Sequence, residues 1–239
     1  MPPELLTGTI FLVAGFIQGM TGFGSALIAL PLLSLFLDIK IAVPLCILNS
    51  LVITTTMALQ LKKHFEKKKI LPLCLAAIPG VILGVTLLKN SGSDIIRISL
   101  ALLLICYSLY SLLSTPKHPN LHPNWAIPAG FLSGLIGAIF SAGGPPTIIY
   151  TALSNWSKDQ IKATLTGFFL FNSYLIAIAH TSSGLINSTV LSLFLYSAPM
   201  VLVGTLLGGR CYGLLKKDLY LKVIFAFLVV MGMMLLGTF

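Results

Sequence analysis

The chain has 239 residues, of which 56% are hydrophobic and 9% are charged. Soluble domains carry roughly a quarter charged residues, so this composition excludes an ordinary water-exposed surface. The formal net charge is +9, but the basic residues lie in the breaks between apolar runs and are not interleaved with aromatic residues, which argues against a nucleic-acid partner.

Eight apolar segments follow one another along the chain. Several reach the roughly 20 residues that cross about 30 Å of hydrocarbon as a helix. The sequence therefore predicts an all-α polytopic membrane protein, located in the inner (plasma) membrane as a multi-pass protein. The segments cover residues 5–37, 41–61, 70–88, 95–113, 125–153, 163–179, 185–207 and 223–239.

The first and fifth segments differ from the other six. As continuous helices they would be roughly 45–50 Å long, at about 1.5 Å per residue. Glycines and hydroxyl residues interrupt the first at 19–25, before Pro31, and glycines, Ser141 and two prolines interrupt the fifth at 134–146. Non-helical backbone at membrane depth is tolerated only where protein or a water-filled cavity covers it. Each break therefore indicates a cavity.

The two breaks belong to an internal repeat. It predicts two homologous halves, residues 1–116 and 124–239, joined by a polar linker at 117–123 within one transmembrane domain. An offset of 115 residues aligns Gly15-Phe16 with Gly130-Phe131, Gly19 with Gly134, Gly22 with Gly137 and Pro31 with Pro146. With a few extra residues in the second half, Asn49-Ser50 aligns with Asn172-Ser173, Pro79 with Pro199, Gly84 with Gly204 and Asp94 with Asp218.

The distribution of Lys and Arg favours inverted halves. If every segment crossed once, six of these residues would lie on the side of the 62–69 loop and nine on the other. If the interrupted segments are hairpins of two short helices, the split becomes twelve inside and three outside, as the positive-inside rule requires. We therefore predict two inverted-topology repeats, each a glycine/proline-broken re-entrant hairpin followed by three transmembrane helices. The linker is then cytoplasmic, and only Lys40, Lys89 and Arg97 lie outside.

The breaks and two asparagines supply the candidate substrate-binding residues. A helix that begins inside the membrane presents free N–H groups and a partial positive charge, which suit an oxyanion. All charged residues fall at segment ends or in loops, so binding would depend on the backbone and on neutral donors. The candidates are Thr21, Gly22, Gly24, Ser25, Asn49, Ser141, Gly143, Gly144, Pro145, Thr147 and Asn172.

These residue types also have structural interpretations. Glycines outside the breaks, such as Gly84 and Gly204, are interpreted as sites of close helix packing. Asn49 and Asn172 can brace the hairpins through interhelical hydrogen bonds as readily as they can contact a substrate. His180 is interpreted as an interfacial residue rather than a proton carrier. The spacing of the four cysteines fits no metal or redox site and no catalytic motif lies in a span, so we expect no metal, no cofactor and no enzymatic activity.

The repeat carries the patterns Gly19-x-x-Gly22-Phe23-Gly24-Ser25-Ala26-Leu27-x-x-x-Pro31-Leu32-Leu33, Gly134-x-x-Gly137 and Gly143-Gly144-Pro145-Pro146, followed by the stretch 162–172. Over the whole chain this duplicated pattern resembles the sulfite exporter TauE/SafE family of membrane proteins. Ser141 departs from it, because many members have glycine there. The resemblance implies export of small, often sulfur-containing anions such as sulfite or sulfonates.

The function predicted is that of a secondary transporter. It would export a small anion, sulfite or an organosulfonate, by alternating access, with the anion held at half-helix N-termini near the bilayer midplane. The partners expected are this anion and the lipid bilayer, and a coupling ion (H⁺ or Na⁺) and a homodimer are both compatible with the sequence. An anion channel or a passive membrane subunit is the alternative, because glycine-broken re-entrant segments also build pores.

Overall fold

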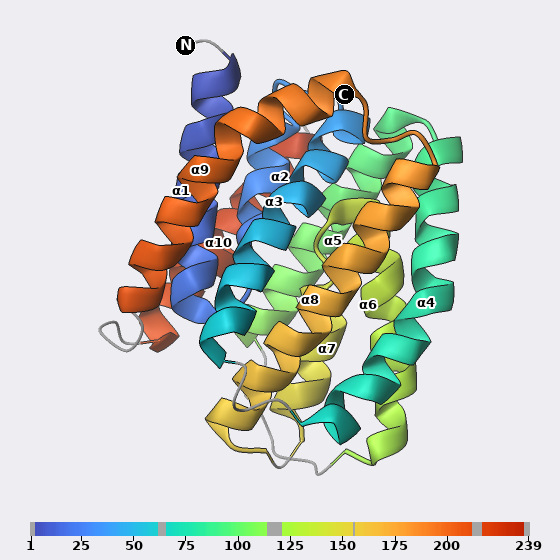
Figure 1. Ribbon diagram of the computed structural model, residues 1–239, viewed down its shortest axis with the longest axis vertical. Helices are drawn as coiled ribbons and strands as arrows, with labels where there is room; N and C mark the ends of the chain where they lie inside the picture. Colours follow the sequence, from blue (N-terminus) through green and yellow to red (C-terminus); the bar gives the residue numbers. More distant parts are fainter. Residues whose placement is uncertain (1–2, 62–65, 114–120, 155, 212–216, 237–239) are drawn as a thin grey trace.

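The computed structural model describes residues 3–61, 66–113, 121–154, 156–211 and 217–236, and these residues contain helices and no strand. Seven of the described helices are long and apolar enough to cross a membrane. The predicted all-α fold is confirmed, and the chain is a multi-pass membrane protein. The helices are α1 (Pro3–Thr21), α2 (Ser25–Leu33), α3 (Ile39–Leu61), α4 (Lys67–Asn90), α5 (Ser93–Leu113), the 3₁₀ turn η2 (Pro123–Trp125), α6 (Ala126–Phe140), α7 (Gly144–Ala152), α8 (Lys158–Ser182), α9 (Ser188–Arg210) and α10 (Lys217–Leu236) (Figure 1).

Each interrupted segment folds as a long helix followed by a short one. α1 and α6 have 19 and 15 residues, and α2 and α7 have 9 residues each. The first helix of each pair is longer than the predicted short helix because it packs along a helix of the other half, α9 for α1 and α4 for α6. The second helix only returns from the break toward the end of the bundle from which the pair starts (Figure 1).

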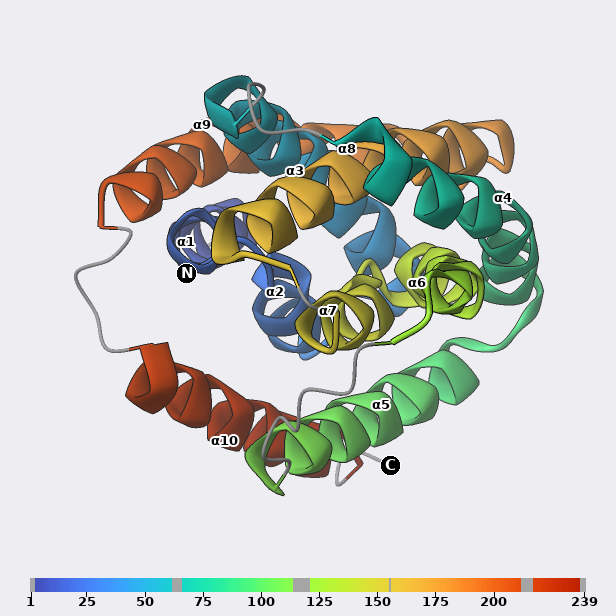
Figure 2. The same cartoon turned by 90° about the horizontal axis from the view of Figure 1, so that it is seen from below.

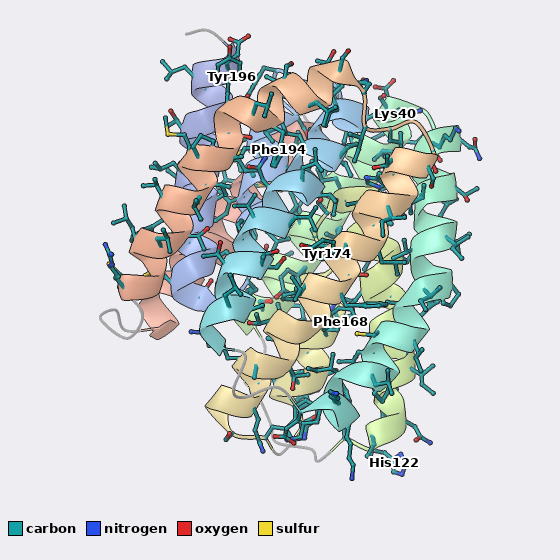
Figure 3. The ribbon with its side chains drawn as sticks, viewed as in Figure 1. Lys40, His122, Phe168, Tyr174, Phe194 and Tyr196 are labelled. Carbon is teal, nitrogen blue, oxygen red and sulfur yellow. The ribbon has the colours of Figure 1, made fainter. Side chains whose placement is uncertain are left out.

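The two helix pairs start from opposite ends of the bundle. In Figure 1, α1 descends from the upper end and α2 returns toward it, whereas α6 rises from the lower end and α7 returns downward. Lys40 marks the upper end and His122 the lower end in Figure 3. Seen along the bundle in Figure 2, α1, α2, α6 and α7 lie inside, between the crossed pair α5 and α10 and a layer formed by α3, α4, α8 and α9.

Glycines allow the helices of the two predicted halves to interlock. A Cβ atom added at Gly84 on α4 would lie 2.6 Å from the carbonyl oxygen of Leu135 on α6. One added at Gly204 on α9 would overlap the carbonyl oxygen of Leu12 on α1. Both glycines therefore serve close helix packing, as the sequence indicated. Because α5 also packs on α10, α3 on α8 and α9, and α4 on α8, extensive helix contacts join one half to the other.

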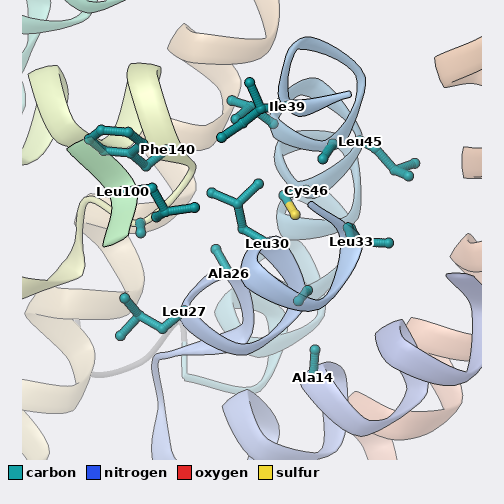
Figure 4. Close-up of a cluster of buried hydrophobic side chains, with 14 of the residues drawn as sticks. Ala14, Ala26, Leu27, Leu30, Leu33, Ile39, Leu45, Cys46, Leu100 and Phe140 are labelled. Carbon is teal, nitrogen blue, oxygen red and sulfur yellow. The ribbon is translucent and has the colours of Figure 1, made fainter. Parts of the chain in front are cut away.

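The degree of burial varies widely among the membrane-length helices. In the membrane-length stretch of α3, 72% of residues are buried, against 28% in α5 and 33% in α9. The exposed side of the outer helices carries large apolar residues such as Leu75, Leu102 and Leu195, which suit contact with lipid. The short helix α2 is held inside the bundle because Leu30 is fully buried in a cluster that includes Ile39 and Leu100 (Figure 4).

Two basic residues donate hydrogen bonds to the backbone at the upper end of the bundle. At the upper end, Lys40 Nζ donates to the carbonyl oxygen of Lys89 at 3.1 Å, and Arg97 Nη2 donates to the carbonyl oxygen of Leu37 at 3.2 Å. The three basic residues predicted to lie outside are therefore gathered at one end. Much of the predicted inner basic sequence, including residues 62–65, 117–120 and 216, lies outside the described residues.

Candidate functional site

A pocket lies where the two breaks face helices α3 and α8. The space there that no protein atom fills amounts to about 510 Å³, a volume that includes open solvent at the mouth. Its walls come from both breaks and from one face of each of these two helices. The lining residues are Gln18, Phe23, Gly24, Ser25, Ala26, Leu27, Ile47, Ser50, Thr54, Gly137, Ser141, Ala142, Gly143, Gly144, Phe169, Asn172, Ser173 and Ile176.

The first break is a tight turn that directs the first turn of α2 at the pocket. Gly22 and Gly24 have φ angles of 94° and 99°, which favour glycine. Gln18 Oε1 on α1 accepts a hydrogen bond from Ser25 N at 3.3 Å and one from Ser25 Oγ. The next amides of α2, those of Ala26 and Leu27, belong to the first turn and have no partner inside the helix. Both residues line the pocket.

Thr21 closes the end of α1 rather than the pocket wall. Its Oγ1 lies 2.8 Å from the carbonyl oxygen of Ile17 and 2.7 Å from that of Phe23. The hydroxyl proton is therefore committed to the backbone of the turn. Thr21 therefore stabilises the conformation of the break and does not line the pocket.

The second break starts α7 with fewer free donors. Gly144 is the first residue of α7, and Pro145 and Pro146 in its first turn lack N–H groups. Thr147 N donates to Ser133 Oγ on α6 at 3.2 Å. Gly144 is thus the residue of this turn whose amide remains for a ligand. The α7 terminus contributes mainly its partial positive charge, and the α2 terminus contributes charge and donors.

The structural equivalence of the two breaks differs from the sequence alignment at the prolines. The ends of α1 and α6 (Thr21, Phe140) and the starts of α2 and α7 (Ser25, Gly144) are each 119 residues apart, rather than 115. Pro31 therefore lies late in α2, whereas Pro146 lies in the first turn of α7. The aligned prolines Pro31 and Pro146 therefore have different roles. Pro146, together with Pro145, removes N–H donors from the first turn of α7, whereas Pro31 does not affect the first turn of α2.

Ser141 joins the second break to α3. It is the non-glycine residue with a positive φ, 57°, among the described residues. Its Oγ donates to the carbonyl oxygen of Val43 at 3.2 Å. Because a left-handed backbone is unfavourable for a residue with a Cβ, this bond helps to hold the turn in a conformation that glycine would adopt freely.

The two aligned asparagines have different surroundings. Asn49 Nδ2 donates to Leu45 O at 3.0 Å and to Ser197 Oγ on α9 at 2.9 Å, away from the pocket. Asn172 lines the pocket and is 5% exposed, and its Oδ1 is buried without a hydrogen-bond partner among the described residues. Asn49 Oδ1 is likewise buried without a described partner, so the two residues differ in that Asn49 Nδ2 bonds to another helix whereas Asn172 lines the pocket.

Comparison with known proteins identifies the family. A family model described as "Sulfite exporter TauE/SafE" matches residues 7–235. The chain belongs to this family. It is also similar to a "Probable sulfite/organosulfonate exporter TauE" of Cupriavidus necator, with 25% identity over 203 residues that cover 82% of this chain and 78% of the relative. No solved structure matches the chain significantly.

In this TauE/SafE family member, six of the sequence candidates line the pocket: Gly24, Ser25, Ser141, Gly143, Gly144 and Asn172. The other five are not among the lining residues: Thr21, Gly22, Asn49, Pro145 and Thr147. The candidate set omitted six lining residues that bear polar groups or aromatic rings: Gln18, Phe23, Ser50, Thr54, Phe169 and Ser173.

The sequence repeat also aligns two residues that accept hydrogen bonds from the short helices. Gln18 and Ser133 are related by the same 115-residue offset as the break glycines. Both accept a hydrogen bond from an amide in the first turn of the following short helix, at Ser25 and Thr147 respectively. The repeat therefore pairs these two capping residues although their side chains differ.

His180 is buried rather than interfacial. It is 0% exposed, and its Nε2 lies 3.0 Å from the carbonyl oxygen of Ala138 on α6. Its Nδ1 is buried without a partner among the described residues. The residue thus links α8 to the helix that leads into the second break. Within the part of the chain that the structure describes, no three His, Cys, Asp or Glu side chains form a group that could hold a metal ion.

Proposed function

We propose that the protein is a secondary transporter in the plasma membrane that exports a small sulfur oxyanion, sulfite or an organosulfonate. The anion is held between the first turns of α2 and α7, and access alternates between the two sides of the membrane. The observation that carries this proposal is the convergence of two helix N-termini and neutral donors on one pocket. The family and the name of the Cupriavidus relative support the class of substrate.

The character of the pocket supports an anionic ligand. A helix N-terminus carries roughly half a positive charge, and two of them face this space. Ser50, Ser173 and Asn172 add hydroxyl and amide groups. Asn172 supplies an observation independent of the helix ends: its Nδ2 can donate to an anion, and its unpartnered Oδ1, an acceptor, is satisfied only by a ligand that carries a proton.

The helix arrangement supports alternating access through inverted repeats. The α1–α2 and α6–α7 pairs start from opposite ends of the bundle (Figure 1). α1 packs tightly on α9 and α6 on α4, while α3 and α8 lie between these pairs. A rocking movement of the α1–α9 pair against the α4–α6 pair would open the pocket first to one side and then to the other.

The membrane orientation follows from charge and can be checked separately. The cluster of Lys40, Lys89 and Arg97 would lie outside, and the end bearing Lys69 and His122 would lie inside. In a version without native cysteines, a cysteine at Gly92 should react with an impermeant reagent in intact cells. A cysteine at His122 should react only after permeabilisation. Equal labelling of both from outside would contradict the orientation.

Transport by purified protein in liposomes tests the function. The wild type should take up radiolabelled sulfite or methanesulfonate with saturation and counter-exchange, whereas unsaturable flux would indicate a channel. Gly144→Leu should abolish flux by filling the pocket, because a Cβ there meets side-chain atoms, Ile148 Cδ1 at 3.2 Å and Phe169 Cζ at 3.7 Å, rather than backbone. Gly92→Leu is the control, since a Cβ at Gly92 has nothing within 4 Å. Normal flux through a folded Gly144→Leu protein would overturn the proposed site.

A further inference from the structure

We infer that the pocket selects singly charged anions, so that sulfite is carried as hydrogen sulfite and sulfonates are accepted directly. Doubly charged sulfite and sulfate are excluded by the same pocket. This inference rests on the proposed function and specifies the charge state of the substrate.

The pocket wall carries no formal charge, since every lining side chain is apolar or neutral. Four described side chains on the lining helices belong to ionisable residue types: Glu4 on α1, Lys40 on α3, and Lys162 and His180 on α8. Glu4 and Lys40 lie in the first turns of their helices, at the upper end, and His180 contacts α6. The Lys162 stem comes nearest to a break, with Cγ 4.0 Å from a Cβ placed at Gly22.

The positive potential available in the pocket matches one negative charge. Each helix N-terminus acts as roughly +0.5 of an elementary charge, so α2 and α7 together offer about one. The free energy needed to remove an ion from water grows with the square of its charge, and even one charge costs several kcal/mol in a protein interior. A dianion would therefore face a much larger penalty against the same potential.

The hydrogen-bond donors of the pocket are neutral groups, and several of them already bond within the protein. Ser25 N and Oγ donate to Gln18, Thr147 N donates to Ser133, and Ser141 Oγ donates to Val43. Thr54 Oγ1 donates to the carbonyl oxygen of Ser50 at 2.7 Å. The donors on lining residues that have no described partner include the amides of Ala26, Leu27 and Gly144, the hydroxyls of Ser50 and Ser173, Asn172 Nδ2 and Gln18 Nε2, and all of them are neutral.

The pocket also contains features that suit a protonated or organic anion. Asn172 Oδ1 is an acceptor without a described partner, and rotation of the amide can present it to the proton of hydrogen sulfite. Sulfite and sulfate dianions have no proton to offer. Phe23, Phe169 and Ile176 form an apolar part of the wall, against which the organic group of a sulfonate can lie.

The test measures the affinity of the purified wild-type protein by thermal-shift titration at two pH values. These lie one unit below and one unit above the second ionisation of sulfite. If hydrogen sulfite is the ligand, the apparent affinity for total sulfite should fall about ten-fold at the higher pH. Methanesulfonate keeps one charge throughout, so its affinity reports any titration of the protein, and sulfate should bind at least about ten-fold more weakly than methanesulfonate.

The outcomes separate this inference from the proposed function. If sulfite binds equally well or better at the higher pH, relative to methanesulfonate, or if sulfate binds as well as methanesulfonate, the charge selection is wrong while anion transport stands. If none of the three anions shifts the unfolding temperature and liposomes show no flux, the proposed function fails and this inference fails with it.

Discussion

Gln18 Oε1 accepts a hydrogen bond from Ser25 N across the first break, at 3.3 Å. The contact joins the last turn of α1 to the first residue of α2 and fixes where α2 begins. It thereby directs the amides of Ala26 and Leu27 at the pocket. A neutral side chain in this role satisfies a buried donor without placing negative charge beside the site.

Replacing Gln18 should damage both stability and binding. Gln18→Leu leaves the buried N–H and hydroxyl of Ser25 without an acceptor, which should cost about 1–3 kcal/mol. Gln18→Glu keeps an acceptor but adds a negative charge, so it should weaken anion affinity more than it lowers the unfolding temperature. Thr9→Val is the control, because Thr9 is exposed on the same helix. Unchanged unfolding temperature and affinity in both Gln18 variants would refute this role.

Replacing Asn49 should lower stability, whereas replacing Asn172 should lower anion affinity. Asn49→Leu removes the hydrogen bond to Ser197, and a double-mutant cycle with Ser197→Ala should show a coupling energy of about 1 kcal/mol without a change in anion affinity. Asn172→Leu should weaken anion affinity and have little effect on stability, since its Oδ1 has no described protein partner. Thermal unfolding with and without methanesulfonate measures both quantities. Loss of affinity in Asn49→Leu alone would reverse the two assignments.

The contact between α4 and α6 should depend on the absence of a side chain at Gly84. Gly84→Ala places Cβ 2.6 Å from the carbonyl oxygen of Leu135, so the helices must separate, at a cost of about 1–3 kcal/mol. Gly92→Ala provides the matched control, since its Cβ has open space. Unfolding temperature in detergent compares the two, and equal values would show that α4 and α6 adapt without strain.

Glu66 should make the contact between α4 and α8 sensitive to acid. The hydrogen bond from Lys69 lowers the pKa of Glu66, and the charge of Lys69 and a hydrogen bond from Gln160 on α8 act in the same direction. A carboxyl whose pKa is lowered by folding stabilises the protein above its unfolded pKa, and this contribution is lost as pH falls through the folded pKa. Glu66 is exposed, so the effect is small.

The unfolding temperature of the wild type and Glu66→Gln, measured over a pH series, checks this expectation. The wild type should exceed the variant near neutral pH, and the difference should vanish as pH falls through the lowered pKa of Glu66. A difference that persists in acid would show that Glu66 acts through packing rather than through its charge.

Several features of the fold were accessible from the sequence for clear physical reasons. Long apolar runs predict helices in a membrane because unpaired backbone groups are too costly there, and the glycine clusters located both breaks. The sequence did not predict which helices pack against the glycines. Nothing local in the sequence indicates that Gly84 meets Leu135 or that Gly204 meets Leu12, because those contacts arise from the crossing of helices from different halves.

At the candidate site, the sequence likewise could not predict which side chains line the pocket. Asn49 and Asn172 align in the repeat, but only Asn172 lines the pocket, since the rotation of each helix about its own axis decides where a side chain points. The donors remaining at α7 could be counted only once Thr147 N was found to bond Ser133. The repeat aligns Gln18 with Ser133, but because the two side chains differ in kind, their shared role as acceptors became clear only from the contacts.

Anomalous diffraction from crystals grown with selenite, a heavier analogue of sulfite, tests the central claim most directly. A selenium peak between the first turns of α2 and α7, within hydrogen-bond reach of the Ala26 and Leu27 amides and beside Asn172, is the result predicted here. A selenium peak at another position, such as the basic end of the bundle, with none between the two breaks in protein that transports sulfite, would contradict it.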